Sequence, residues 1–165
     1  MMLRLVFSAL AIMLIAPNIA EAHDYKLGAL TIDQPWARVT IANRPAAGYM
    51  TIINNGDEPD RVLSAASPKA DRVELHTHTM QDGVMKMAPA GIIEIPANGQ
   101  VEFAPGGLHL MIFGLKALPK LGDSLPVTMN FERSGSIDLE FEVGEPGQAV
   151  PAPAMDHSGH GAAKP

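Results

Sequence analysis

Turn signals divide this chain into short segments, and that spacing limits it to a few folds. Examples are Asn54-Asn55-Gly56-Asp57, Asp82-Gly83, Asn98-Gly99 and Pro105-Gly106-Gly107. They recur roughly every 8–12 residues, with short apolar or alternating runs between them, and no convincing long helix is present. About nine or ten short strands at this spacing predict an all-β, antiparallel sandwich or barrel.

The expected strands follow from these runs, with Asp33-Gln34-Pro35 taken as a turn and Leu115–Leu121 as either one helical turn or a loop. The candidate segments for these nine or ten strands are Lys26–Ile32, Trp36–Thr40, Ala46–Ile53, Arg61–Ala65, Arg72–Met80, Val84–Ala88, Ile92–Ile95, Gln100–Phe103, Leu108–Leu115, Leu125–Glu132 and Ser136–Val143.

The first 22 residues have the organisation of a secretory signal peptide. Met1–Arg4 carries one positive charge, Leu5–Ala16 is apolar, and Ala20-Glu21-Ala22 matches an A-x-A cleavage site. A membrane anchor is the alternative, but the apolar run is well short of the roughly 20 residues that span a bilayer. We therefore expect an exported protein that begins at His23 after cleavage and has no membrane span.

The sequence contains no cysteine, which excludes several classes of site. Disulfides, blue-copper centres, iron–sulfur clusters and cysteine-rich zinc sites all need a thiolate, and a lipid anchor would also need a cysteine. The net charge of −6 is unchanged by loss of the leader, because Arg4 and Glu21 leave together. An acidic chain of this kind argues against a nucleic-acid partner.

One stretch of the chain is unusually rich in nitrogen and thioether donors. Residues two apart on a strand point to the same face. Three donor pairs have this spacing: His76 with His78, Met85 with Met87, and His109 with Met111.

A hairpin turning at Asp82-Gly83 would bring the first two pairs together. A loop of two or four residues places Met80 opposite Met85 and His78 opposite Met87, with His76 diagonal to Met87. One face of the hairpin then carries both histidines and all three methionines.

A mixed histidine and methionine set without thiolates fits copper(I) best, and silver(I) would behave similarly. Zinc more often takes three histidines or includes a carboxylate or thiolate, and calcium or magnesium takes oxygen. The competing interpretation is structural, since methionine often fills cores; we expect this for Met50 and Met129.

At these residues the chain resembles the PCuAC family of periplasmic copper(I) chaperones. The resemblance lies in the spacing of His76, Met87, His109 and Met111, and it covers roughly Leu27–Val143. The surrounding motifs agree: Pro35-Trp36-Ala37-Arg38, Ala47-Gly48-Tyr49-Met50, Asn55-Gly56, Val73-Glu74-Leu75-His76 and Pro105-Gly106-Gly107-Leu108-His109-Leu110-Met111.

The resemblance implies a cupredoxin-like, Greek-key β-sandwich over residues 23–143 with a copper(I) site near its surface. The implied ligands are His76, Met87, His109 and Met111. The hairpin register, however, places His78 more directly opposite Met87 than His76, so His78 stays an alternative to His76 as the ligand. His78 and Met85 are candidate accessory donors. Some members of the family have methionine after the first histidine, where this chain has Thr77. The resemblance also implies a periplasmic location and a copper-accepting partner in the respiratory cytochrome c oxidase or its assembly factors.

Residues 144–165 are rich in Pro, Gly and Ala, and we expect them to form a flexible tail. Met155, His157 and His160 in this tail resemble the copper(II)-binding extensions of some family members, although a solvated tail that binds metal only incidentally would look the same.

The expected function is transfer of copper by ligand exchange, without catalysis. A copper-dependent oxidative enzyme is one alternative, because a mature N-terminal His23 would supply the amine and imidazole of a histidine brace. A metal-free sandwich that serves as an interaction module is the other.

Overall fold

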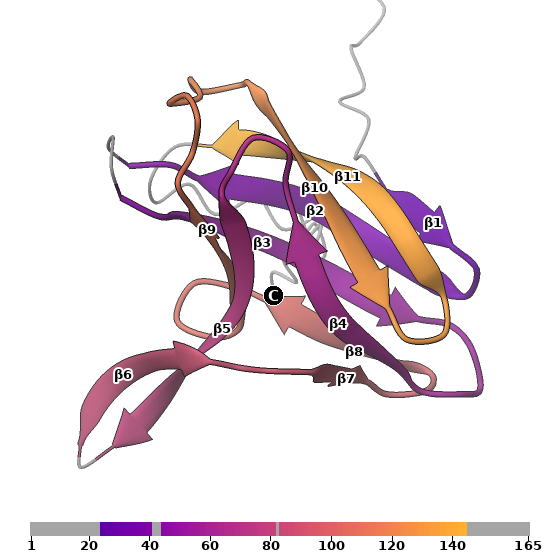
Figure 1. Cartoon of the computed structure of the whole chain (residues 1–165). Helices are drawn as coiled ribbons and strands as arrows, with labels where there is room; N and C mark the ends of the chain where they lie inside the picture. Colours follow the sequence, from indigo (N-terminus) through magenta and orange to yellow (C-terminus); the bar gives the residue numbers. More distant parts are fainter. Residues whose placement is uncertain (1–23, 41–43, 82, 145–165) are drawn as a thin grey trace, which may run out of the picture.

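A computed structural model describes residues 24–40, 44–81 and 83–144, and all regular structure in them is β (Figure 1). The eleven strands of this part of the chain are β1 Tyr25–Leu27, β2 Leu30–Arg38, β3 Ala46–Asn54, β4 Asp60–Ala66, β5 Arg72–Gln81, β6 Val84–Pro89, β7 Ile93–Ile95, β8 Gly99–Phe103, β9 His109–Phe113, β10 Ser124–Phe131 and β11 Gly135–Gly144. The expected leader, His23 and the tail beyond Gly144 lie outside the described residues. Within the described ranges, no helix has the length and apolarity needed to cross a membrane.

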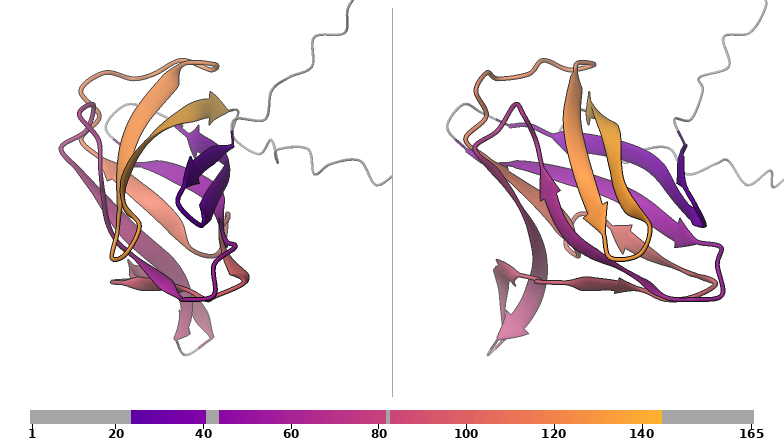
Figure 2. Two further views of the ribbon diagram at one scale, coloured as in Figure 1. Left: turned by 90° about the vertical axis from the view of Figure 1, so that its right-hand side faces the viewer. Right: turned by 45° about the vertical axis from the view of Figure 1, so that its right-hand side comes forward.

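The strands wrap into a flattened barrel that is also a two-layered sandwich (Figures 1 and 2). Their order is β1-β2-β11-β10-β4-β5-β9-β3-β8, and β2 also pairs with β3, which closes the sheet on itself. All pairings between these strands are antiparallel except that of β11 with β2. The predicted all-β, antiparallel fold is confirmed.

Alternating side chains from the two layers fill the core. Leu110 and Ile112 of β9 are fully buried, as are Leu139 and Phe141 of β11. Each such side chain contributes about 1.5–3 kcal/mol through removal of apolar surface from water. The methionines expected to be structural, Met50 and Met129, also lie in this core.

The predicted turn at Asp33-Gln34-Pro35 is wrong. The strand β2 runs straight through it, and the pairing with β3 shifts register between Asp33 and Trp36. Gln34 has a φ of 46°, so the Asp-Gln-Pro segment forms a bulge instead of reversing the chain. The chain instead reverses direction earlier, at the turn that contains Gly28 between β1 and β2. Leu115–Leu121, left open as a helical turn or a loop, contains no helix.

Strand β5 changes partners along its length, and this change places the candidate site. Its first half pairs with β9 from Arg72 to His76, whereas its second half pairs with β6. Beyond His76, β5 and β6 therefore form a two-stranded extension that projects from the barrel (Figure 1). We call residues 77–81 and 83–88 the ribbon.

Candidate metal centre

Two buried imidazoles lie side by side where the ribbon leaves the barrel. His76 on β5 is paired directly with His109 on β9, and their ring centroids are 6.0 Å apart. His76 is 9% exposed and His109 is 2% exposed. Two polar rings this deeply buried need hydrogen-bond partners or a ligand.

Each of the two rings has one nitrogen engaged and one nitrogen without a partner. His109 Nδ1–H donates to the Gly107 carbonyl at 2.9 Å, and His76 Nε2–H donates to the Glu74 carboxylate at 2.9 Å. Since both acceptors can only accept, the protons sit on these nitrogens. His109 Nε2 and His76 Nδ1 are thus unprotonated, buried and without a hydrogen-bond partner. Those are the lone pairs that a metal ion would take up.

The electrostatic surroundings keep His109 neutral. Burial lowers the pKa of His109 below its ordinary value. The hydrogen bond to the Gly107 carbonyl opposes this shift, and electrostatic repulsion from the neighbouring His78, His76 and Arg38 adds to it. The ring therefore carries no second proton at neutral pH and can act as a ligand.

Glu74 positions His76 and is itself held in place. Its pKa lies below the ordinary value, first because His76 donates a hydrogen bond to it and then because Arg72 does, at 2.7 Å from Nε to Oε1. The Arg72 guanidinium also lies 4.1 Å from the centroid of Phe113 on β9. A carboxylate behind a histidine in this way fixes ring orientation and makes the free nitrogen a better donor.

The candidate methionine ligands flank the histidine pair on the same face. Met111 is half-buried on β9, two residues from His109 and directly opposite Glu74. Met87 on β6 is 48% exposed. Both are diagonal neighbours of His76, within reach of a long side chain. The arrangement places imidazoles inside and thioethers outside.

The predicted hairpin register is confirmed. Met80 pairs with Met85 and His78 pairs with Met87, so His76 reaches Met87 only across the diagonal. His78 is half-buried, its ring centroid is 5.0 Å from that of His109, and its Nδ1 is 3.4 Å from the Gly107 carbonyl. The structure thus brings His78 to the same cluster but leaves Met85 out on the ribbon. The expected tail donors Met155, His157 and His160 lie outside the described residues.

An aromatic wall closes the other side of His109. The Tyr49 ring is 6.5 Å from the imidazole centroid and 4.5 Å from that of Trp36. Arg38 Nη2 donates to the Tyr49 hydroxyl at 3.2 Å. This wall excludes water from His109 on the side away from the ribbon.

Sequence reasoning did not assign roles to Glu74, Gly107 or Tyr49 at this site. Glu74 was detectable, because it shares the strand face of His76 by simple alternation. The Gly107 carbonyl and the Tyr49 ring come from a loop and from another strand, and only the pairing of β3, β5 and β9 brings them in.

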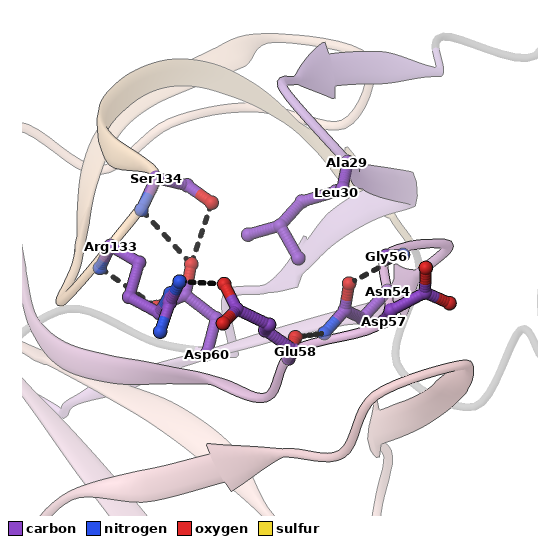
Figure 3. Close-up of a pocket in the computed structure, with 9 residues that line it drawn as sticks. All are labelled: Ala29, Leu30, Asn54, Gly56, Asp57, Glu58, Asp60, Arg133 and Ser134. Carbon is purple, nitrogen blue, oxygen red and sulfur yellow. Dashed lines mark hydrogen bonds and ion pairs between the residues drawn. The ribbon is translucent and has the colours of Figure 1, made fainter.

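A hollow of about 420 Å³ lies at the start of β4, between the β3–β4 connection and the β10–β11 turn (Figure 3). Its buried Asp60 accepts hydrogen bonds from the amides of Arg61, Arg133 and Ser134 and from the Ser134 hydroxyl. These bonds anchor the β10–β11 turn to β4. With its carboxylate fully engaged, we read this hollow as structural.

The donors on the ribbon side favour a soft metal. Among residues 24–40, 44–81 and 83–144, no group of three or more His, Asp or Glu side chains could hold a metal ion. Met87 and Met111 flank His76 and His109, and imidazole with thioether is a donor set suited to copper(I).

Comparison with known proteins gives a family and two relatives. Residues 30–143 match the family model described as "Putative lipoprotein LpqE-like". The chain is 29% identical over 117 residues to the "Putative lipoprotein Lxx21020" of Leifsonia xyli subsp. xyli (strain CTCB07), covering 70% of this chain and 69% of that protein. It is 32% identical over 104 residues to the uncharacterized protein RP573 of Rickettsia prowazekii (strain Madrid E), covering 60% of this chain and 58% of RP573.

Solved structures with the same fold are copper-binding domains. The copper-bound PCuAC domain from PmoF2 superposes with a TM-score of 0.64 at 26% identity, over 75% of this chain and 99% of that domain. The apo PCuAC domain from PmoF1 gives 0.65 at 25% identity, over 75% and 100%. The solution structure of CuI-DR1885 from Deinococcus radiodurans gives 0.55 at 28% identity, over 76% and 83%.

Proposed function

Because the chain belongs to the LpqE-like family and shares its fold with copper-binding PCuAC domains, we propose that it is an exported copper chaperone. Copper(I) is its cargo, bound by His76, Met87, His109 and Met111 and passed on by ligand exchange. Names of the relatives that include "lipoprotein" support export.

One observation carries the proposal: two buried imidazole nitrogens face no hydrogen-bond partner. His76 Nδ1 and His109 Nε2 lie on directly paired residues, and the other nitrogen of each ring is held by an acceptor. A buried polar atom without a hydrogen-bond partner lowers the stability of the folded state by about 1–3 kcal/mol. Binding of a metal ion to both nitrogens would remove this loss.

The donor set suits transfer as well as binding. Two neutral imidazoles and two thioethers hold copper(I) without the strong grip of thiolates. Met87 is the most exposed of the four and lies on the ribbon. A donor atom of the acceptor protein can therefore displace the Met87 sulfur first, while the two histidines still coordinate the ion. The acceptor we propose is a protein of the respiratory cytochrome c oxidase or of its assembly, reached in the periplasm.

Burial favours His76 over His78 as the ligand. His76 has a buried nitrogen without a hydrogen-bond partner, and the Glu74 carboxylate is bonded to the other nitrogen of its ring. His78 is more exposed and meets only a distant carbonyl. We assign His78 to the margin of the site, and the tail histidines His157 and His160, with Met155, to copper(II) capture.

The test is a copper(I) competition titration of the wild type, His109→Ala, Met111→Leu and the control Met129→Leu, which alters a core methionine away from the site. We expect affinity to fall by orders of magnitude for His109→Ala and clearly for Met111→Leu, with no change for the control. Leucine preserves the apolar volume of Met111, so loss of affinity there reports on the sulfur. Unchanged affinity in both site variants would overturn the proposal.

A further inference from the structure

The ribbon has one face made of sulfur and imidazole. His78 pairs with Met87 and Met80 pairs with Met85, so these four side chains form two successive rungs on the same side. The opposite side carries Thr77, Thr79, Val84, Lys86 and Ala88. All methionines of the ribbon therefore share the face of His78.

Packing does not account for these methionines. Met80 is 67% exposed and Met85 is 59% exposed, whereas the core methionine Met129 is fully buried. In the described part of the chain, β6 pairs with β5 alone, and β9 ends its pairing with β5 at His76. An exposed thioether gains little from the hydrophobic effect, so the position favours a role for the sulfur itself.

The spacing allows the sulfurs to converge. Directly opposed residues of an antiparallel pair have Cβ atoms about 4.5–5.5 Å apart, and the neighbouring rung lies within reach of long side chains. Methionine has three rotatable bonds, so the Met80 and Met85 sulfurs can approach one ion from two strands. Met87 and His78 stand on the next rung toward the barrel.

The second rung connects this face to the buried histidine pair. The His78 ring lies 5.0 Å from that of His109, closer than the 6.0 Å between His76 and His109. The donors thus continue without a gap from the Met80–Met85 rung, through His78 and Met87, to His109.

We propose that the ribbon holds a second, weaker soft-metal site, formed by Met80 and Met85 and completed by His78. It would take copper(I) or silver(I), because its donors are thioethers with one imidazole and no carboxylate. That the ion there is the same cargo as in the buried site rests on the proposed function; binding of a soft ion by the ribbon does not.

The test is a silver(I) titration of the complete exported protein, followed by NMR of the labelled methionine methyl groups. In the wild type we expect Met111 and Met87 to shift with the first equivalent and Met80 and Met85 with a later one. Met155 has its own signal, so binding by the tail is observed separately.

The decisive variant is Met80→Leu with Met85→Leu, which keeps apolar volume and removes both sulfurs. We expect loss of the later binding step with the first step retained. The matched control is Thr79→Leu with Lys86→Leu, the directly paired rung on the opposite face, which should leave both steps in place.

The outcomes separate the two proposals. If Met80 and Met85 do not shift in the wild type, or if the later step survives their replacement, the ribbon site is wrong. That result is also the one expected if this face of the ribbon binds an apolar protein partner instead of a metal ion. If Met80 and Met85 shift but Met111 does not, the ribbon site stands and the proposed buried site fails.

Discussion

His76 and Glu74 lie two residues apart on β5, and the Glu74 carboxylate accepts the Nε2–H of His76 at 2.9 Å, while the ring's Nδ1 is buried and has no hydrogen-bond partner. The pair orients a candidate ligand from within a single strand. Arg72 completes the row by donating to the other carboxylate oxygen.

Replacing Glu74 should weaken copper(I) binding without removing a ligand. We expect Glu74→Ala to lower affinity by about 10–100-fold, the usual effect of losing a group that orients a metal-bound histidine. Glu74→Gln should lose less, since its amide oxygen can still accept from Nε2. A competition titration measures both, with Glu102→Gln, at an exposed residue of β8, as control. Equal losses for the alanine and glutamine variants would contradict an orienting role.

The two hairpin histidines should differ in their importance. We expect His76→Ala to reduce copper(I) affinity much more than His78→Ala, because only His76 has a buried ring nitrogen without a partner. The same titration measures both variants. A larger loss for His78→Ala would reverse the assignment and make the directly paired Met87 its partner.

Gly114, which follows β9, should not tolerate a side chain. Its φ is +64°, and a Cβ there would collide with the Asp71 carboxylate. The left-handed conformation alone disfavours an L-residue by about 1–2 kcal/mol, and displacement of Asp71 adds to this. We expect Gly114→Ala to lower the free energy of unfolding, measured by denaturant titration, whereas Gly106→Ala, with open space and φ +86°, should lose only the conformational part.

Asp60 should make stability depend on acid pH. Burial would raise the pKa of Asp60, but the Ser134 hydroxyl and the amides of Arg133, Arg61 and Ser134 together lower it. The folded pKa is therefore below the unfolded value of about 3.9. Its stabilisation is fully present above that value and is lost as the pH falls through the folded pKa.

The measurement is denaturant unfolding at pH 7 and in the acid range below pH 4, on the wild type and on Asp60→Asn. We expect Asp60→Asn to have a lower free energy of unfolding than the wild type at pH 7, and this free energy to fall less than that of the wild type when the pH is lowered. A variant with the wild-type acid dependence would show that Asp60 is not the group responsible.

The sequence was sufficient for the all-β fold and for the hairpin register, because turn residues and two-residue periodicity are local properties. It failed at Asp33-Gln34-Pro35, where a turn-like composition forms a bulge under the constraint of pairing with β3. The pairing of His76 with His109 depends on β5 and β9, which are far apart along the chain. The burial of the two rings and the hydrogen bond from His109 to the Gly107 carbonyl could therefore not be predicted from the sequence. The assignment of the two histidines as ligands stays a prediction.

The exchange of partners along β5 gives the two halves of this strand unequal protection. Residues up to His76 are held between β9 and the rest of the barrel, whereas the ribbon can open by losing only its own ladder. Local opening of this kind requires less free energy than global unfolding. Amide hydrogens of the ribbon should therefore exchange with solvent sooner than those of Val73 and Leu75. In such an opening Met87 would move away from His76 while the barrel stayed folded. The rate at which the β5–β6 hairpin opens would then set the rate at which a bound ion is released.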